Sequence, residues 1–325
     1  MQILILKEAE VERLGDDALV LDTVEEAFRL WGQGRAEMPS KSYLSFPESH
    51  GDLRTMPAYL PSLNAAGVKI VNSHPDNPKI GLPTVMATLI LNDPATGRPA
   101  AILGATALTA LRTGAAGALA ARVLARADAG SAGFIGGGTQ ARYQLRFLVR
   151  VRPVSKIRVY DIDPSRADSF CDHARGLGLT DVKRSASARE AAGESIVITT
   201  TPGTGPVCDA AAFKPGAHVN AIGADAPGKQ ELPAALLSRA KVVVDHRDQA
   251  SHSGEINVPL EKGVFRPKQI HAELGDIVAG KRPGRASDEE ITLFDSTGIA
   301  ILDVAVGKRI YDRAVQEKIG NRVDI

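Results

Sequence analysis

With 325 residues, the chain is long for a single hydrophobic core, and we expect two domains. Its 39 basic and 38 acidic residues leave a net charge of +1, which gives no attraction to nucleic acid or an acidic membrane and favours a small-molecule partner. The sequence has neither an N-terminal signal peptide nor a run of about 18 uncharged apolar residues, so we expect a cytoplasmic protein.

The first part of the chain predicts an α+β domain. Residues 10–34 carry apolar side chains at helical spacing and end in glycines, which predicts one helix. Five β-rich stretches separated by proline and glycine follow, as is typical of an antiparallel or mixed sheet. They are residues 41–46, 53–59, 67–71, 84–91 and 100–103. The alanine-rich residues 105–126 then predict one long helix that connects two domains.

From residue 131 onward, short strands alternate with helices, which predicts a doubly wound α/β domain. The basic residues 280–285 are expected in an exposed loop, and residues 299–318 form a helix that we expect to return to the N-terminal half. Cys171 and Cys208 lie far apart without a histidine pattern, so we expect reduced thiols and no metal site. The predicted strands are residues 132–135, 156–160, 182–184, 195–200, 218–222, 241–244 and 291–294.

Residues 136–141 carry a dinucleotide-binding fingerprint, G-x-G-x-x-A, directly after a predicted strand. Gly136 permits the tight turn, Gly138 lets a pyrophosphate approach the backbone, and Ala141 allows close packing of helix on strand. The N-terminus of the helix that follows supplies free N–H groups and a favourable dipole. The segment therefore predicts a Rossmann-type cofactor site.

The acid that such a site requires is Asp161, which ends the next strand about 20 residues later. A carboxylate there bonds the ribose hydroxyls and repels a 2′-phosphate, so we expect NAD as the cofactor. The structural alternative is that the glycines only make a turn and Asp161 caps a helix. Arg166 lies nearby and leaves NADP open.

Two residues in predicted strands or strand ends have a chemical interpretation and a structural alternative. An inward-facing Lys69 would act in catalysis or bind a carboxylate, because burying an unpaired ammonium is costly, whereas on an edge strand it would face solvent. Asp225 follows the strand at 218–222, where open α/β sheets bind ligands and an acid/base is useful. Its alternative is an Asx-turn.

Two further patches lie on the connecting helix and after the last strand. Arg112 stands among small residues, and its guanidinium suits a phosphate or a carboxylate unless it is solvated. Ser296 and Thr297 follow the strand at 291–294, where they either cap the next helix or reach the nicotinamide end of the cofactor.

Taken together and in this order, these segments resemble the ornithine cyclodeaminase/μ-crystallin family, and most closely its archaeal-type alanine dehydrogenase branch. The resemblance extends over nearly the whole chain. It is carried by residues 52–58, 69–75, 81–86, 111–116, 136–140, 220–232, 254–257 and 294–298.

The resemblance implies a homodimer whose N-terminal sheets join across the interface. The implied fold is α/β, with an NAD-binding Rossmann domain at residues 118–297. Residues 1–117 and 298–325 form an α+β substrate-binding and dimerisation domain, which the C-terminal helix completes. The active site is implied in the cleft beside the Rossmann domain.

The resemblance also implies roles for individual residues. Lys69 matches the catalytic lysine and Asp225 the acid/base aspartate of the family. Lys41, Arg54 and Arg112 fall at substrate-facing positions. The implied cofactor-binding residues are Arg112, Gly136, Gly138, Thr139, Gln140, Asp161, Asp163, Ala221, Gly223, Lys229 and Ser296.

By analogy with the alanine dehydrogenase branch, we expect reversible NAD-dependent oxidative deamination of L-alanine to pyruvate and ammonium. A cyclodeaminase, a ketimine or other imine reductase, and a non-catalytic crystallin-like binding protein are the alternatives within the family. One residue bears on this choice. The family's ornithine cyclodeaminases carry a glutamate at the position of Arg54, where it receives the distal ammonium of ornithine, and this chain departs from that pattern.

Overall fold

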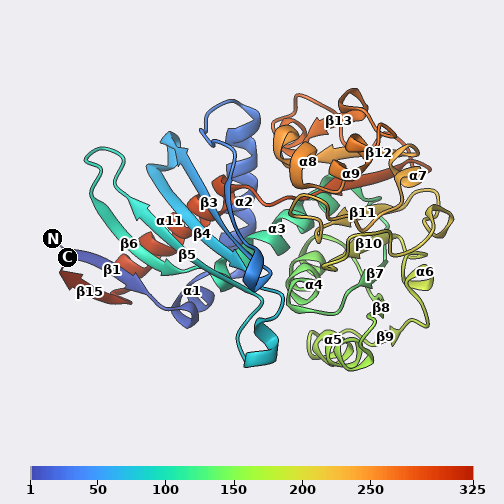
Figure 1. Cartoon of the computed structure of the whole chain (residues 1–325), viewed down its shortest axis with the longest axis horizontal. Coiled ribbons are helices and arrows are strands. Elements are labelled where there is room, and N and C mark those ends of the chain that lie inside the picture. The colour runs from blue at the N-terminus through green and yellow to red at the C-terminus, as the bar shows by residue number, and fades with distance from the viewer. Residues whose placement is uncertain (1, 325) are drawn as a thin grey trace. The chain divides into compact units, whose positions relative to one another are not determined.

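The computed structural model describes residues 2–324, which divide into two compact units. The first unit comprises Met1–Arg112 and Ile299–Ile325, and the second comprises Thr113–Gly298. Each unit contains one sheet (Figure 1). No helix within residues 2–324 is long and apolar enough to cross a membrane.

The first unit is built on a seven-stranded sheet in the order β15-β1-β6-β5-β4-β3-β2. The five strands that the sequence predicts are confirmed. The two strands at one edge, β1 (Gln2–Leu6) and β15 (Asn321–Asp324), pair antiparallel and were not predicted. The remaining strands are β2 (Ser42–Phe46), β3 (Gly51–Leu60), β4 (Ala65–Ser73), β5 (Val85–Asn92) and β6 (Pro99–Gly104).

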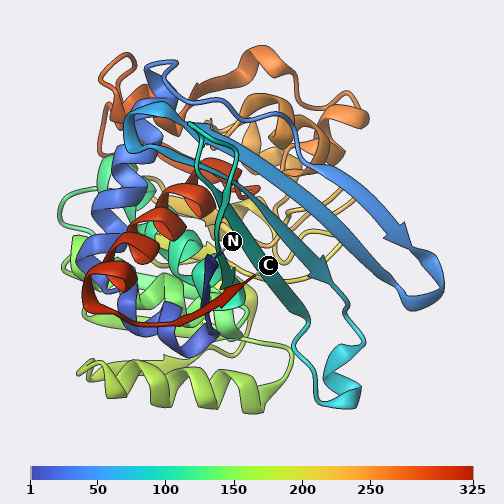
Figure 2. The same cartoon turned by 90° about the vertical axis from the view of Figure 1, so that its left-hand side faces the viewer.

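One face of this sheet is covered by the C-terminal helix α11 (Ala300–Glu317), which packs on β3, β4 and β5 and lies beside α2 (Figure 2). Its first part is almost fully buried, from Ala300 to Gly307. The expected return of the C-terminal segment to the N-terminal half is therefore confirmed.

The single helix predicted for residues 10–34 is wrong, because the chain forms two helices, α1 (Glu8–Leu14) and α2 (Asp17–Gly32). Gly15 ends α1 in a non-helical conformation, and Asp16 caps α2 by accepting a hydrogen bond from the Leu19 N–H at 2.9 Å. The apolar stripe continues across this break, so the spacing alone did not reveal it.

The second unit contains an eight-stranded parallel sheet in the order β13-β12-β14-β11-β10-β7-β8-β9, which is the predicted doubly wound arrangement. The alanine-rich helix α3 (Thr106–Leu124) leads into it. Its strands are β7 (Ser131–Ile135), β8 (Lys156–Tyr160), β9 (Asp181–Arg184), β10 (Ile196–Thr199), β11 (His218–Ala221), β12 (Ala240–Val244), β13 (Ile270–Glu273) and β14 (Ile291–Asp295).

Helices of this unit connect the parallel strands. The longest are α4 (Thr139–Val151) and α5 (Pro164–Gly176). The shorter ones are α6 (Ala188–Ala191), α7 (Ala234–Leu237), α8 (Arg247–Ser253), α9 (Asn257–Glu261) and α10 (Leu274–Val278). Strand β13 was not predicted, since its apolar and polar residues, IHAE, alternate over only four positions.

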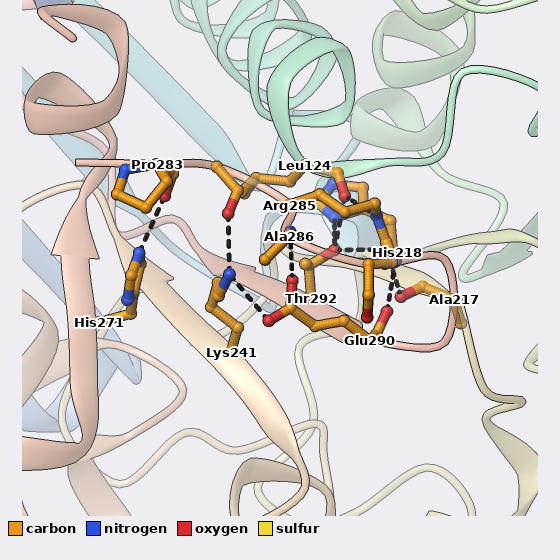
Figure 3. A network of polar contacts seen from close by, with 12 residues as sticks. Leu124, Ala217, His218, Lys241, His271, Pro283, Arg285, Ala286, Glu290 and Thr292 are labelled. Carbon is orange, nitrogen blue, oxygen red and sulfur yellow. Dashed lines mark hydrogen bonds and ion pairs between the residues drawn. The ribbon is translucent and has the colours of Figure 1, made fainter.

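The exposed loop predicted for residues 280–285 is only partly correct. Lys281 and Arg282 are exposed, but the Arg285 guanidinium is half-buried and donates to the carbonyl oxygens of Leu124 and Ala217 and to the Thr292 hydroxyl (Figure 3). These bonds fasten the end of α3 to the amino ends of β11 and β14. The basic residues look alike in sequence, and only the fold separates them.

Candidate functional site

The glycine loop follows β7 and leads into α4, as the fingerprint predicts. Gly136 has a positive φ of 97°, and a Cβ there would lie 2.8 Å from the Thr200 hydroxyl oxygen, so glycine is required on both counts. Gly138 forms the N-cap of α4, and a Cβ built on it would meet nothing within 4 Å. The backbone at Gly138 therefore faces open space at the N-terminus of a 13-residue helix, which suits an anion.

The first turn of α4 carries the two predicted contact residues, Thr139 and Gln140. The Thr139 side chain is exposed. The Gln140 Oε1 atom is buried and has no hydrogen-bond partner among the described residues. A buried amide without a partner costs free energy, so this atom is suited to a ligand at the start of the helix.

Asp161 lies beside the glycine loop. Its Oδ2 atom accepts a hydrogen bond from the Gly137 N–H at 2.8 Å, and its Oδ1 atom accepts one from the Asp163 N–H at 2.9 Å. Asp161 does not cap the next helix. The N-cap of α5 is Asp163. The hydrogen bonds that Asp163 accepts from Ser165 lower the pKa of its carboxyl group.

Arg166, the residue that kept NADP as a possible cofactor, is exposed and lies 3.6 Å from a carboxylate oxygen of Asp163. This ion pair holds the guanidinium near Asp163. Asp163 and Arg166 both follow Asp161 within five residues of the chain.

The carboxyl ends of β10 and β11 are joined by a buried glutamate that sequence reasoning missed. Glu231 accepts hydrogen bonds from the Thr199 hydroxyl, the Thr201 N–H and the Gly223 N–H, at 2.7, 2.6 and 2.8 Å. A Cβ at Gly223 would lie 2.2 Å from the Thr201 carbonyl oxygen, so the loop after β11 needs glycine here. Ala221 and Ile222, which precede Gly223 at the end of β11, are buried.

A second missed carboxylate, Glu255, supports the first by accepting hydrogen bonds from the Glu231 and Leu232 N–H groups. Burial raises the pKa of Glu231, and burial together with Glu231 and Asp295 raises the pKa of Glu255 well above its usual value. Their sequence surroundings, EL and GEIN, carry no sign of this burial.

Asp225 and Lys229 lie on the loop after β11 and form an ion pair at 2.6 Å, with about a third and a quarter of their side chains exposed, 36% and 25% respectively. Asn257 steadies this loop by accepting from the Gly228 N–H and donating to the Lys229 carbonyl. The predicted acid thus stands partly accessible at the carboxyl edge of the sheet.

Ser296 is buried directly after β14, and its N–H donates to the Ala221 carbonyl, so both lie at the same sheet edge. The capping role considered for Ser296 and Thr297 is wrong. Helix α11 begins at Ala300 with Ile299 as an N-cap that makes no side-chain hydrogen bond, and Thr297 instead bonds Asp245.

The first unit holds a cluster of four buried cations, which we call the cationic cluster. Lys69 lies on β4, an interior strand, and is 1% exposed, so the solvent-facing alternative is wrong. Residues paired across antiparallel strands share a face, and the pairs Met56–Lys69 and Arg54–Val71 place Arg54 and Lys69 on the same buried face. The cluster comprises Lys41, Arg54, Lys69 and Arg112.

A carboxylate on α11 joins two of these cations. The Asp303 Oδ2 atom is 2.8 Å from the Lys69 Nζ atom, and its Oδ1 atom accepts a hydrogen bond from the Arg112 Nε–H at 2.9 Å. Burial and the nearby Arg112 lower the pKa of Lys69 to about 7, although Asp303 acts in the opposite direction. Asp303 was missed in the sequence, where it stands within an apolar helical segment.

The other two cations lie around an aromatic ring. The Lys41 Nζ and Arg54 Cζ atoms are 5.7 and 5.5 Å from the centre of the Tyr43 ring. Arg54 also binds Asp52 in bidentate fashion, at 3.0 and 2.8 Å. The six charged side chains therefore comprise four cations and two carboxylates.

The chain is similar to known proteins over nearly its whole length. A model described as the ornithine cyclodeaminase/mu-crystallin family matches residues 1–318. An alanine dehydrogenase from Archaeoglobus fulgidus is 49% identical over 323 residues, which cover 99% of this chain and 98% of the relative.

Two solved structures show the same fold. An archaeal alanine dehydrogenase dimer with bound NAD has a TM-score of 0.96 at 49% identity, and the match covers 100% of both chains. A Thermococcus litoralis Delta(1)-pyrroline-2-carboxylate reductase in complex with NADH and L-proline also has a TM-score of 0.96, at 38% identity, with 99% of this chain and 100% of that chain covered.

Proposed function

The chain belongs to the ornithine cyclodeaminase/mu-crystallin family, and on that premise we propose that it oxidises L-alanine to pyruvate and ammonium with NAD. It is an NAD-dependent enzyme of the amino acid dehydrogenase type, with a Rossmann-like cofactor domain. The main support for the substrate class is the buried cationic cluster, whose guanidinium and ammonium groups suit a carboxylate.

The residues of the second unit fit NAD. The open backbone at Gly138 and the free N–H groups at the N-terminus of α4 would hold the pyrophosphate end. Asp161 would bond the adenosine ribose, with Asp163 and Thr139 close by, and the carboxyl ends of β11 and β14 would receive the nicotinamide end. When bound, NAD accepts a hydride from the substrate α-carbon.

The cationic cluster would bind the substrate carboxylate. Its four side chains are all buried, and two of them are guanidinium groups. Arg54, Arg112 and Lys41 would hold the carboxylate, since guanidinium groups suit planar oxyanions.

Two residues would handle protons. Hydride transfer requires the substrate amine to be neutral, and the iminium that results must then take up water and lose ammonia. A lysine with a pKa of about 7 can accept and return a proton near neutral pH, which suits Lys69. Asp225, partly accessible and held by Lys229, would exchange protons with the water and the amine.

We also propose that the protein is a homodimer formed through the first unit. Six large apolar side chains there are exposed, by 37% to 72%, at one end of strands β2 to β5. The Phe46 ring stacks on His74, which brings the end of β2 beside the β4–β5 connection. A second copy would cover these side chains, which are Leu44, Phe46, Ile80, Leu82, Val85 and Met86.

An imine reductase is the second candidate. It is favoured by the solved pyrroline-2-carboxylate reductase, whose product also carries one carboxylate. The cationic cluster would accept either substrate, because its charges select the carboxylate and not the amine.

Incubation of the purified protein with NAD and single amino acids, followed by NADH absorbance, separates these functions. We expect NADH from L-alanine and the reverse reaction with pyruvate and ammonium. NADH oxidation with a cyclic imine but none with pyruvate and ammonium would favour the reductase. No NADH change with any substrate would indicate a binding protein.

A further inference from the structure

The Asp303 carboxylate raises the pKa of Lys69, whereas burial, Arg112 and Lys41 lower it. Asp303 lies in the first turn of α11 and has no exposed surface. We propose that Asp303 is a positioning residue, which sets the place and the proton of Lys69 and shares its charge with Arg112. This inference rests on the proposed function in one respect only, namely that Lys69 transfers a proton during catalysis.

The geometry supports this division of one carboxylate between two cations. Each oxygen of Asp303 serves a different cation, Lys69 at 2.8 Å and Arg112 at 2.9 Å, and the three side chains come from β4, α3 and α11. All three are at least nine-tenths buried, so water does not replace a missing contact.

The immediate strand neighbours of Lys69 offer no substitute for Asp303. Met56 on β3 and Leu89 on β5 stand opposite Lys69 in the sheet and are apolar. The Lys69 ammonium is therefore directed towards α11, and Asp303 opposes the effect of burial and of the two neighbouring cations on its proton.

A purely structural role would be different. If Asp303 only fastened α11 to the sheet, replacing it would lower stability but leave the proton affinity of Lys69 in the folded protein unchanged. The test must therefore measure the protonation of Lys69 itself.

The experiment is NMR of the full chain labelled with carbon-13 at the lysine ε-carbon, titrated between about pH 5 and pH 11 without substrate. Lys69→Met identifies the Lys69 signal. In Asp303→Asn, which keeps the side-chain shape, we expect the Lys69 midpoint to fall by at least about one pH unit. Asp312→Asn is the matched control, because Asp312 lies on the same helix in an exposed pair with Lys308 and should leave the midpoint unchanged.

A second variant shifts the midpoint in the opposite direction and covers the case in which Asp303→Asn does not fold. Arg112→Gln removes the competing cation, so the Lys69 midpoint should rise. An unchanged midpoint in the folded variants would overturn the proposal. Because the titration needs no substrate, its result is separate from whether L-alanine is oxidised.

Discussion

The Asp161 carboxylate accepts a hydrogen bond from the Gly137 N–H at 2.8 Å, so the acid at the end of β8 is tied directly to the glycine loop after β7. Its second oxygen bonds the Asp163 N–H. We therefore expect two separable effects of Asp161. Its charge would repel a 2′-phosphate, and its oxygen atoms hold the loop.

The first prediction uses this separation. We expect the native protein to bind NADH appreciably tighter than NADPH, because the Asp161 charge disfavours the additional phosphate. Asp161→Asn removes the charge but keeps an oxygen that can accept from the Gly137 N–H. The difference in affinity between NADH and NADPH should therefore shrink, while the affinity for NADH changes little. Asp161→Ala should weaken both, since the loop also loses its support. Fluorescence titration measures all six affinities, and equal affinity of the native protein for the two cofactors would contradict the prediction.

The second prediction concerns Asp225. Asp225→Asn should lower turnover by about 10²- to 10⁴-fold, the usual contribution of a general acid/base, and leave NADH binding nearly intact. Steady-state kinetics and NADH titration check this result. Asp209→Asn, an exposed aspartate of the same unit with a long contact to Arg189, is the control. Near-native turnover of Asp225→Asn would remove Asp225 from the catalytic role.

The third prediction concerns pH and the buried Lys69. The pKa of Lys69 is lowered by burial to about 7 in the folded protein, whereas a lysine in the unfolded chain has a pKa near 10.5. Between these values the unfolded state binds more protons, so stability rises with pH, and the full cost of the buried charge is present below about pH 7.

Lys69→Met removes this cost. The variant should therefore melt at a higher temperature than the native protein at pH 6, and its advantage should shrink as the pH approaches 10. Asp303 keeps Arg112 as a partner in the variant, so no carboxylate is left without a cation. Thermal melts over this pH range measure the difference, and a constant difference would show that Lys69 does not titrate as inferred.

The cofactor unit was predictable because its signals are local. A strand, a turn with Gly136 and a helix follow one another within a few residues, and parallel strands between helices show as short continuous apolar runs. Strand β13 was not predicted because Ile270–Glu273 is short and contains both apolar and polar residues. Likewise, β1 and β15 pair only because the two ends of the chain meet, which no local pattern reveals.

The site was predictable only in part, for a similar reason. Lys69 and Arg112 were noticed because a charge in apolar surroundings stands out. Asp303, Glu231 and Glu255 act through partners far away in the sequence, such as the 191-residue separation between Arg112 and Asp303. A carboxylate in a helix or a loop is usually solvated, so no local pattern distinguished these three from the other acids.

The fourth prediction concerns assembly. The exposed apolar side chains at the end of β2 to β5 should be buried by a second copy, so light scattering should give the mass of a dimer at micromolar concentration. Leu44→Lys with Ile80→Glu places charges in the contact and should favour the monomer. Val264→Lys, which changes an exposed apolar residue of the other unit, should leave the dimer intact. A native protein that stays monomeric would contradict the proposal.

The last prediction concerns the choice of substrate, and it depends on Arg54 and Asp52. Arg54 is 5% exposed and already paired with Asp52, so part of its charge is balanced before substrate binds. Its remaining attraction, together with Lys41 and Arg112, still favours a carboxylate over a second ammonium. We therefore expect NADH from L-alanine and no proline from ornithine.

Arg54→Glu tests this interpretation, because it reverses the charge and places a second carboxylate beside Asp52. A lost charge pair in a desolvated site costs about 2–5 kcal/mol, so kcat/KM for L-alanine should fall by at least about 30-fold. Arg98→Glu makes the same charge change on the exposed β5–β6 turn and should have little effect. Proline formed from ornithine by the native protein would overturn the substrate assignment, while the fold and the NAD site would stand, because neither depends on the charge at Arg54.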